Sequence, residues 1–174
     1  MVTLYLLRHA KSSHGDGGLD DRDRPLNGRG RSAAAAIGRY LRDHALQPAL
    51  ILCSTAQRTR ETLEILRTAA QWPIDAPTIR YLDELYLAAP SDILRAVAET
   101  PAATESVMAI GHNPGLHDLA LSLAALQSEG YPELLAHFPT GALAVLTSPE
   151  ATWPRLATTP LTLSAFVRPR DLTA

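Results

Sequence analysis

The sequence predicts a single α/β domain over residues 1–174, with helices on both faces of a mostly parallel central sheet and an antiparallel edge (a three-layer α/β/α arrangement). Two observations predict this fold. Short apolar runs typical of buried strands alternate with segments of helical periodicity. Four of these runs end in a charged or histidine-bearing turn, as expected where the strands of a doubly wound sheet meet their loops. A chain of this length can bury a sizeable core as one domain.

Composition excludes several classes of function. Hydrophobic residues make up 46% of the chain and charged residues 20%, which is ordinary for a globular protein. The net charge of −2 argues against nucleic acid or an anionic membrane surface as partner. No apolar stretch approaches the roughly 20 residues of a membrane span, and the start lacks a secretory signal pattern. We therefore expect a cytoplasmic protein, and a monomer because no exposed apolar stripe stands out. Cys53, the single cysteine, excludes an intrachain disulfide and a cysteine-based zinc site.

The first predicted strand is Val2–Leu7, whose near-continuous apolar run is typical of a strand buried on both faces. Arg8 and His9 follow it directly. In open α/β sheets, ligands bind just beyond the carboxyl ends of the strands. A guanidinium group suits oxyanions, and an imidazole can act as a nucleophile or carry a proton. Either this pair handles an anion, or the strand simply ends in polar residues.

Glycine, aspartate and proline mark Gly15–Pro25 as a loop, whose alternating charges are expected to form a solvated surface. A helix is predicted from Asn27, a good N-cap residue, to about His44. The letters at its start, G-x-G-x-x-A, match a dinucleotide-binding fingerprint. They do not directly follow a strand, and no acidic residue near position 50 could hold a ribose. We therefore attribute this match to coincidence.

The second predicted strand, Ala49–Cys53, leads into a helix over about 56–70 that Ser54 can cap. Arg58 falls in the first turn of this helix, where the macrodipole favours anions rather than cations. A bound anion would resolve that conflict, because Arg58 and the free backbone N–H groups would face it together. The alternative is a solvent-exposed arginine.

Two further predicted strands also end in polar turns. Thr78–Leu82 is followed by Asp83 and Glu84, and Ser106–Ile110 is followed closely by His112. A lone histidine at such a place can equally be a hydrogen-bonded structural residue. The remaining expected elements are helices over Pro90–Glu99, 115–126 and Tyr131–His137, and strands over Ala142–Thr147 and Leu161–Val167 that pair antiparallel at an edge packed by Trp153.

Together the four turns place two arginines, two histidines and a carboxylate at strand ends that a doubly wound sheet gathers on one side. Two guanidinium groups and a protonatable imidazole suit a dianionic phosphoryl group, and the second imidazole can attack it. A metal site built from His9, His14 and Asp16 is the alternative, although its spacing is generic. The other histidines are interpreted as surface or structural residues.

The sequence resembles the histidine phosphatase superfamily in three motifs that occur in the expected order. The motifs are Leu7-Arg8-His9, Ser54-x-x-x-Arg58-x-x-x-Thr62 and Gly111-His112-Asn113-Pro114. The short length and the segments 8–13, 23–27 and 84–86 resemble the small phosphohistidine phosphatase (SixA-like) branch. The resemblance covers about residues 2–148. Ala10 stands where glycine is usual in the family, and Ala56 where proline is usual. Both positions keep a small residue, so neither departure removes a catalytic group.

The resemblance implies a phosphoglycerate mutase-like fold and a metal-independent phosphatase that forms a phosphohistidine intermediate on His9 and needs no cofactor. Arg8 and Arg58 are expected to lower the pKa of His9 and keep it neutral. His112 would donate to the phosphoryl oxygens. The implied catalytic residues are His9, Arg8, Arg58, His112 and Glu84, with Asp83 as the second choice of proton donor, and the implied further substrate contacts are Ser12 and Asn113.

The chain lacks the large inserted segments of phytase-like and mutase-like relatives, which implies an open site that could accept phosphohistidine on a protein in signal transduction. Two alternatives remain open. One is a small-molecule phosphomonoesterase or mutase. The other is a module that uses the same arginines and His112 to recognise phosphate without turnover.

Overall fold

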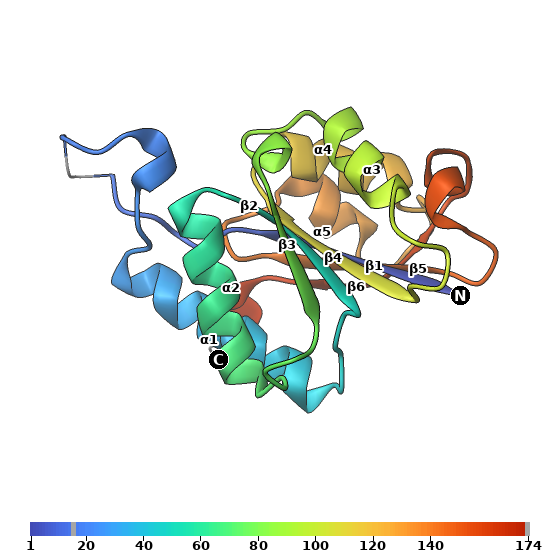
Figure 1. The fold of residues 1–174 in the computed structure, drawn as a ribbon. Coiled ribbons are helices and arrows are strands. Elements are labelled where there is room, and N and C mark those ends of the chain that lie inside the picture. The colour runs from blue at the N-terminus through green and yellow to red at the C-terminus, as the bar shows by residue number, and fades with distance from the viewer. Residues whose placement is uncertain (15–16, 173–174) are drawn as a thin grey trace.

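The computed structural model describes residues 1–14 and 17–172 (Figure 1). Gly15 and Asp16, two residues of the expected loop, lie outside the described residues. Asp16 is also part of the alternative metal site. A six-stranded sheet in the order β3-β2-β4-β1-β5-β6 forms the centre of the molecule. Its strands are β1 (Val2–Arg8), β2 (Leu50–Ser54), β3 (Thr78–Leu82), β4 (Ser106–Gly111), β5 (Leu143–Ser148) and β6 (Thr162–Val167).

The sheet is mostly parallel with an antiparallel edge, which confirms the fold predicted from the sequence. β1 pairs in parallel with β4, and β2 pairs in parallel with both β3 and β4. β5 is antiparallel to β1, and β6 is antiparallel to β5. The register sets Arg8 opposite Gly111 and Cys53 opposite Ile110. The carboxyl ends of β1, β2 and β4 therefore end side by side, so the turns after them meet at one place.

Helices cover both faces of the sheet (Figure 1). Side chains alternate across a strand, so β1 serves two cores. Leu4 and Leu6 pack into one hydrophobic cluster, whereas Tyr5 and Leu7 pack into the other. The cluster with Leu4 and Leu6 includes residues of α3 (Pro90–Ala98), α4 (Gly115–Leu123) and α5 (Tyr131–Ala136). The cluster with Tyr5 and Leu7 includes residues of α1 (Gly28–Asp43) and α2 (Gln57–Ala70).

No helix in residues 1–14 and 17–172 is long and apolar enough to cross a membrane.

Most predicted elements are present, with small differences at their ends. α4 ends at Leu123, earlier than the expected 126. Ser54 does not cap α2: the N-cap residue is Ala56, which has no side-chain capping bond. Ser54 instead bonds His112 across the sheet. Trp153 is buried in the core as expected, and its indole N–H donates to the backbone oxygen of Thr104 at 2.7 Å.

The start of α1 is fixed against the turn after β1. Asn27 caps the helix as predicted, because its side-chain oxygen accepts from the backbone N–H of Gly30 at 2.8 Å. The backbone N–H of Asn27 donates to the carbonyl oxygen of Lys11. A Cβ atom at Gly30 would lie 2.0 Å from that same carbonyl oxygen. Close packing of this helix on the turn therefore explains the glycine, and no bound dinucleotide is needed.

Candidate active site

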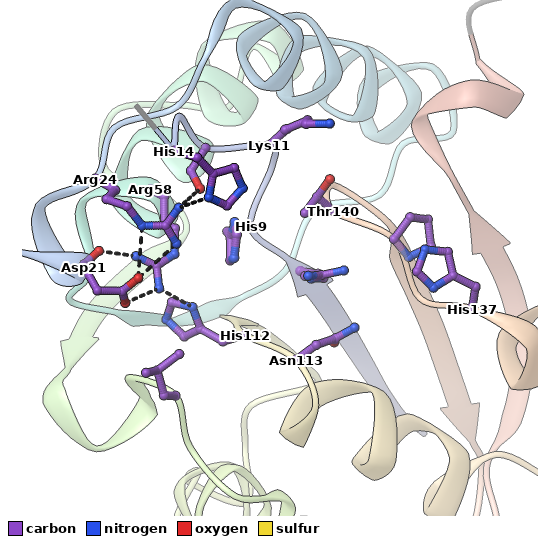
Figure 2. Close-up of a pocket in the computed structure, with 14 residues that line it drawn as sticks. His9, Lys11, His14, Asp21, Arg24, Arg58, His112, Asn113, His137 and Thr140 are labelled. Atoms are coloured by element: carbon purple, nitrogen blue, oxygen red, sulfur yellow. Dashed lines mark hydrogen bonds and ion pairs between the residues drawn. The ribbon is translucent and has the colours of Figure 1, made fainter. Parts of the chain in front are cut away.

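A pocket of about 530 Å³ opens beyond the carboxyl ends of β1 and β4 (Figure 2). It brings together Arg8, His9, Arg58 and His112, which lie far apart in the sequence. Ser12 and Asn113, the two expected substrate contacts, also line it. The remaining lining residues are Lys11, His14, Asp21, Arg24, Leu87, His137, Pro139 and Thr140.

His9 is poised as a neutral nucleophile. Its Nδ1 lies 2.7 Å from the backbone oxygen of Ala10, which can only accept, so Nδ1 carries the proton and Nε2 keeps its lone pair. The pKa of His9 is lowered to about 4, mainly by burial; the hydrogen bond to Ala10 opposes this shift, and the charges of Arg58 and Arg8 add to it. Both arginines contribute, as expected, but desolvation is the larger cause.

The turn that carries His9 is held on both sides. The backbone N–H of His9 donates to the carbonyl oxygen of Gly111, and its own carbonyl accepts from Gly141 at 2.9 Å. The N–H of Ala10 donates to Thr62 Oγ1 at 3.0 Å, and that hydroxyl donates to the carbonyl of Arg58. Thr62, the last residue of the second motif, therefore ties the nucleophile's turn to the helix that carries Arg58.

Arg58 is buried, with 2% of its side chain exposed, which rules out the solvent-exposed alternative. Its guanidinium group donates to the backbone oxygen of Asp21 at 2.6 Å and to the Asp21 carboxylate at 3.0 Å. A further contact, 3.4 Å long, runs to Nδ1 of His112. The Nε of Arg58 is buried without a partner. Arg58 lines the pocket, and a guanidinium group held in place by a carboxylate is suited to bind an oxyanion there.

His112 is also neutral in this geometry. Its Nδ1 accepts from Arg58, so its Nε2 carries the proton and donates to Ser54 Oγ at 2.8 Å. Burial lowers its pKa to about 3, and the charges of His9 and Arg58 act in the same direction. The rings of His9 and His112 lie 5.2 Å apart between centroids. A dianion in the pocket would favour a proton on Nδ1, and His112 could then donate to it.

Arg8 and Asn113 share one anchor. Both side chains donate to the backbone oxygen of Phe138, at 3.0 Å and 2.9 Å respectively. The Nε of Arg8 and the Oδ1 of Asn113 are buried without partners. Burial also lowers the pKa of Arg8. The shared carbonyl therefore holds a guanidinium group and an amide at the pocket wall.

The charged loop before α1 is largely exposed, as predicted, but two of its side chains, Asp21 and Arg24, also line the pocket. Arg24 donates to Ser12 Oγ at 3.0 Å and forms an ion pair with Asp21 at 2.9 Å. Asp21 pairs in turn with Arg58, so Arg24, Asp21 and Arg58 form one network at one side of the pocket (Figure 2). Sequence reasoning missed Asp21 and Arg24, although the segment 23–27 was already among those that resemble the small phosphohistidine phosphatases.

The family model described as "Histidine phosphatase superfamily (branch 1)" matches residues 4–124. The chain belongs to the histidine phosphatase superfamily. It is 36% identical over 143 residues to an uncharacterised protein of Mycobacterium tuberculosis strain H37Rv, covering 80% of this chain and 85% of that protein.

Two solved structures are similar to this histidine phosphatase over nearly its whole length. One is a proposed phosphohistidine phosphatase SixA from Nakamurella multipartitia, with 34% identity, a TM-score of 0.82, and coverage of 97% of this chain and 96% of that one. The other is a proposed SixA from Agrobacterium tumefaciens, with 32% identity, a TM-score of 0.79, and coverage of 95% and 97%. The chain is therefore a SixA-like phosphatase of this superfamily.

The proton donors implied by the resemblance lie outside the pocket of this phosphatase. Glu84 is exposed on the short 3₁₀ helix Asp83–Leu85 and does not line the pocket. The Asp83 carboxylate accepts from Thr55 at 2.6 Å and from Arg22 at 2.9 Å, also away from the pocket. Among the described residues, Asp21 is the only carboxylate that lines it.

Asp21 is held as an anion. The Tyr86 hydroxyl is the main cause that lowers its pKa to about 2, and Arg58 and Arg24 contribute. Asp21 therefore carries no proton to donate at neutral pH. The segment Glu84-Leu85-Tyr86, which resembles the small phosphohistidine phosphatases, contributes to this network through Tyr86. Its hydroxyl donates to the carboxylate of Asp21.

Two histidines interpreted as surface residues line the pocket. His14 and His137 are exposed, as expected, but both contribute to its rim. Asp16 of the metal alternative lies outside the described residues. Within residues 1–14 and 17–172, no group of three or more histidine, cysteine or acidic side chains is arranged to hold a metal ion.

Proposed function

We propose that this histidine phosphatase removes phosphate from phosphohistidine on a protein. The observation that carries the proposal is that none of the described residues lining the pocket is a protonated carboxylic acid. Among the described lining residues the only carboxylate is Asp21, whose pKa of about 2 keeps it ionised. A phosphate ester leaves as an alkoxide and needs a proton from such a group. The imidazole of phosphohistidine leaves through nitrogen and depends much less on an acid.

In the proposed reaction, Nε2 of His9 attacks phosphorus in line with the substrate's P–N bond. A new P–N bond forms to His9, the old one breaks, and its electron pair stays on the departing imidazole nitrogen, which takes a proton from water. A second water molecule then attacks the phosphorus on His9, which releases orthophosphate and restores the neutral ring. His9 suits both steps because burial lowers its pKa to about 4.

Positive charge around the phosphoryl group supplies the transition-state stabilisation in this proposal. Arg8 and Arg58 lie beside His9 with their Nε groups buried and unpartnered. Arg24 is a third guanidinium group that lines the pocket. Fixed cations in a partly buried site stabilise the dispersed charge of a loose phosphoryl-transfer transition state.

The test compares a peptide that carries phosphohistidine with a simple aryl phosphate, with chelator present, for the wild type and His9→Asn. Asparagine can still donate to the backbone oxygen of Ala10, so the turn keeps its hydrogen bond while the nucleophile is removed. We expect phosphate release from the peptide, loss of release in the variant, and a higher kcat/KM for the peptide than for the ester.

Three results would contradict the proposal. Faster turnover of the aryl phosphate would favour a phosphomonoesterase. Return of the phosphoryl group to an acceptor instead of free phosphate would favour a mutase. No turnover of either substrate, together with phosphate binding that is lost in Arg58→Ala, would identify a recognition module.

A further inference from the structure

A second pocket, of about 650 Å³, adjoins the catalytic pocket. Lys11, His137, Pro139 and Thr140 line both pockets, so the two form one continuous depression. The second pocket continues over the start of α1 and the turn after β6. A substrate whose phosphoryl group lies at His9 would extend over Lys11 and Thr140 into this space.

Positive charge dominates the lining of the second pocket. Its described lining residues include no carboxylate and four cations: Lys11, Arg29, Arg168 and Arg170. Asp171 pairs with Arg168 through contacts of 2.8 and 3.0 Å. Lys11 and Arg29 are exposed and make no side-chain ion pair within the described part of the chain. Because the whole chain carries a net charge of −2, this cluster is a local feature and not a general excess of positive charge.

The lining of the second pocket suits an acidic peptide segment. Ala33, Pro139 and Pro169 provide apolar surface between the cations. The first turn of α1 adds the positive end of its helix dipole. Aliphatic surface bordered by cations complements glutamate and aspartate side chains, whose methylene and carboxylate groups need both.

We propose that this second pocket, the basic subsite, binds acidic side chains that flank the phosphorylated residue of the protein substrate. The proposal rests on the proposed function, and it adds that the enzyme selects substrates by negative charge next to the phosphoryl group. Selection by several exposed charges acts mainly on encounter and binding, so it changes kcat/KM more than kcat.

The test measures kcat/KM for two pairs of peptides. In each pair one peptide carries glutamates beside the phosphorylated residue and its partner carries glutamines there. One pair bears phosphohistidine and the other phosphotyrosine, and each rate is normalised to that of a simple aryl phosphate. We expect wild type to prefer the glutamate peptides roughly tenfold, the size expected of a few exposed charge pairs, and the preference to shrink at high salt.

Arg29→Glu is the informative variant, because Arg29 lines the basic subsite but not the catalytic pocket. A glutamate in the first turn of α1 suits the helix dipole, so the fold is expected to tolerate it. Arg39→Glu makes the same charge change on the exposed face of the same helix, away from both pockets, and is the matched control. We expect the glutamate preference to disappear in Arg29→Glu and to persist in Arg39→Glu.

Other outcomes would overturn the basic subsite. These are equal rates for the glutamate and glutamine peptides with wild type, or a preference that Arg29→Glu leaves intact. Inhibition of aryl phosphate hydrolysis by pyrophosphate that only Arg29→Glu relieves, without a peptide preference, would assign the pocket to a small anion instead. If only the phosphotyrosine pair is hydrolysed and shows the preference, the phosphohistidine proposal fails while the basic subsite stands.

Discussion

His9 owes its neutral state mainly to burial, and the neighbouring arginines contribute a smaller part. The charges of Arg58, Arg8 and Arg24 act in the same direction as desolvation, whereas the hydrogen bond to Ala10 opposes them. Each neighbouring cation therefore sets part of the pH range over which the nucleophile is active.

We predict that Arg8→Gln moves the acid limb of the pH–rate profile to higher pH. Wild-type kcat/KM should fall as His9 is protonated near its pKa of about 4, and removal of the Arg8 charge should raise that pKa. The measurement is kcat/KM for one aryl phosphate from pH 3 to 8 with both proteins, so that the ionisation of the substrate is common to both profiles. An unshifted acid limb in the slower variant would show that Arg8 does not act on the charge state of His9.

The Thr62 hydroxyl accepts a hydrogen bond from the buried N–H of Ala10, next to the nucleophile. We predict that Thr62→Val lowers kcat/KM and destabilises the fold by about 1–3 kcal/mol, because the buried N–H of Ala10 loses its acceptor. Thr62→Ser keeps the hydroxyl and should retain most of both properties. Urea unfolding and steady-state kinetics on the two variants test this, and similar losses in both would assign the effect to packing.

Asp21 shows what sequence reasoning could not reach at this scale. It lies 37 positions before Arg58, in a stretch whose alternating charges look like any solvated loop. Its partners, Tyr86 and Arg58, come from distant segments, and local spacing carries no record of such a meeting. Arg8, His9, Arg58 and His112 were predictable because each lies at or shortly beyond the carboxyl end of a strand, and parallel strands bring such ends together.

At the scale of the element, α1 must pack closely on the turn that holds the nucleophile. We predict that Gly30→Ala destabilises the protein by at least about 1–3 kcal/mol and lowers activity, because its Cβ would meet the backbone oxygen of Lys11 at 2.0 Å. Gly28→Ala, in the same helical turn, has open space around the new methyl group and should be neutral or slightly stabilising. Thermal unfolding and kinetics distinguish the two, and equal behaviour would contradict the packing role.

The sequence predicted the helices well where their ends carry chemical signals. Asn27 marked the start of α1 because an amide side chain can accept from a free backbone N–H. Ser54 offered the same signal for α2, but its hydroxyl accepts from His112 instead. Ser54 Oγ accepts a shorter hydrogen bond of 2.8 Å from His112 in the active site, beside a longer local one of 3.4 Å from the N–H of Ala56. Glu84 lies exposed on the 3₁₀ helix after β3, outside the lining of the pocket, whereas Tyr86 from the same turn bonds Asp21.

At the scale of the whole molecule, the sheet explains how a chain of this size places its catalytic groups in one small volume. Parallel pairing of β1 with β4, and of β4 with β2, aligns three strand ends, and helices on both faces bury the strands between them. Burial is also what holds two imidazoles neutral beside two guanidinium groups. The stability of the fold is therefore coupled to the protonation of its active site.

We predict that the free protein loses stability as the pH falls from about 6.5 towards 4. In this range the unfolded chain protonates both imidazoles near their ordinary pKa of 6.5, whereas the folded protein resists protonation until about 4 at His9 and about 3 at His112. The unfolded state then binds more protons, so the free energy of unfolding falls with pH, on the order of 1–3 kcal/mol for each histidine. Asp21, with a pKa of about 2, acts in the same direction only below pH 4.

The double variant His9→Asn, His112→Gln should flatten the pH dependence of Tm between pH 6.5 and 4. His44→Gln, at the exposed end of α1, should keep the wild-type slope. A wild-type Tm that stays constant over this range, or a slope that survives in the double variant, would show that burial does not hold these imidazoles neutral.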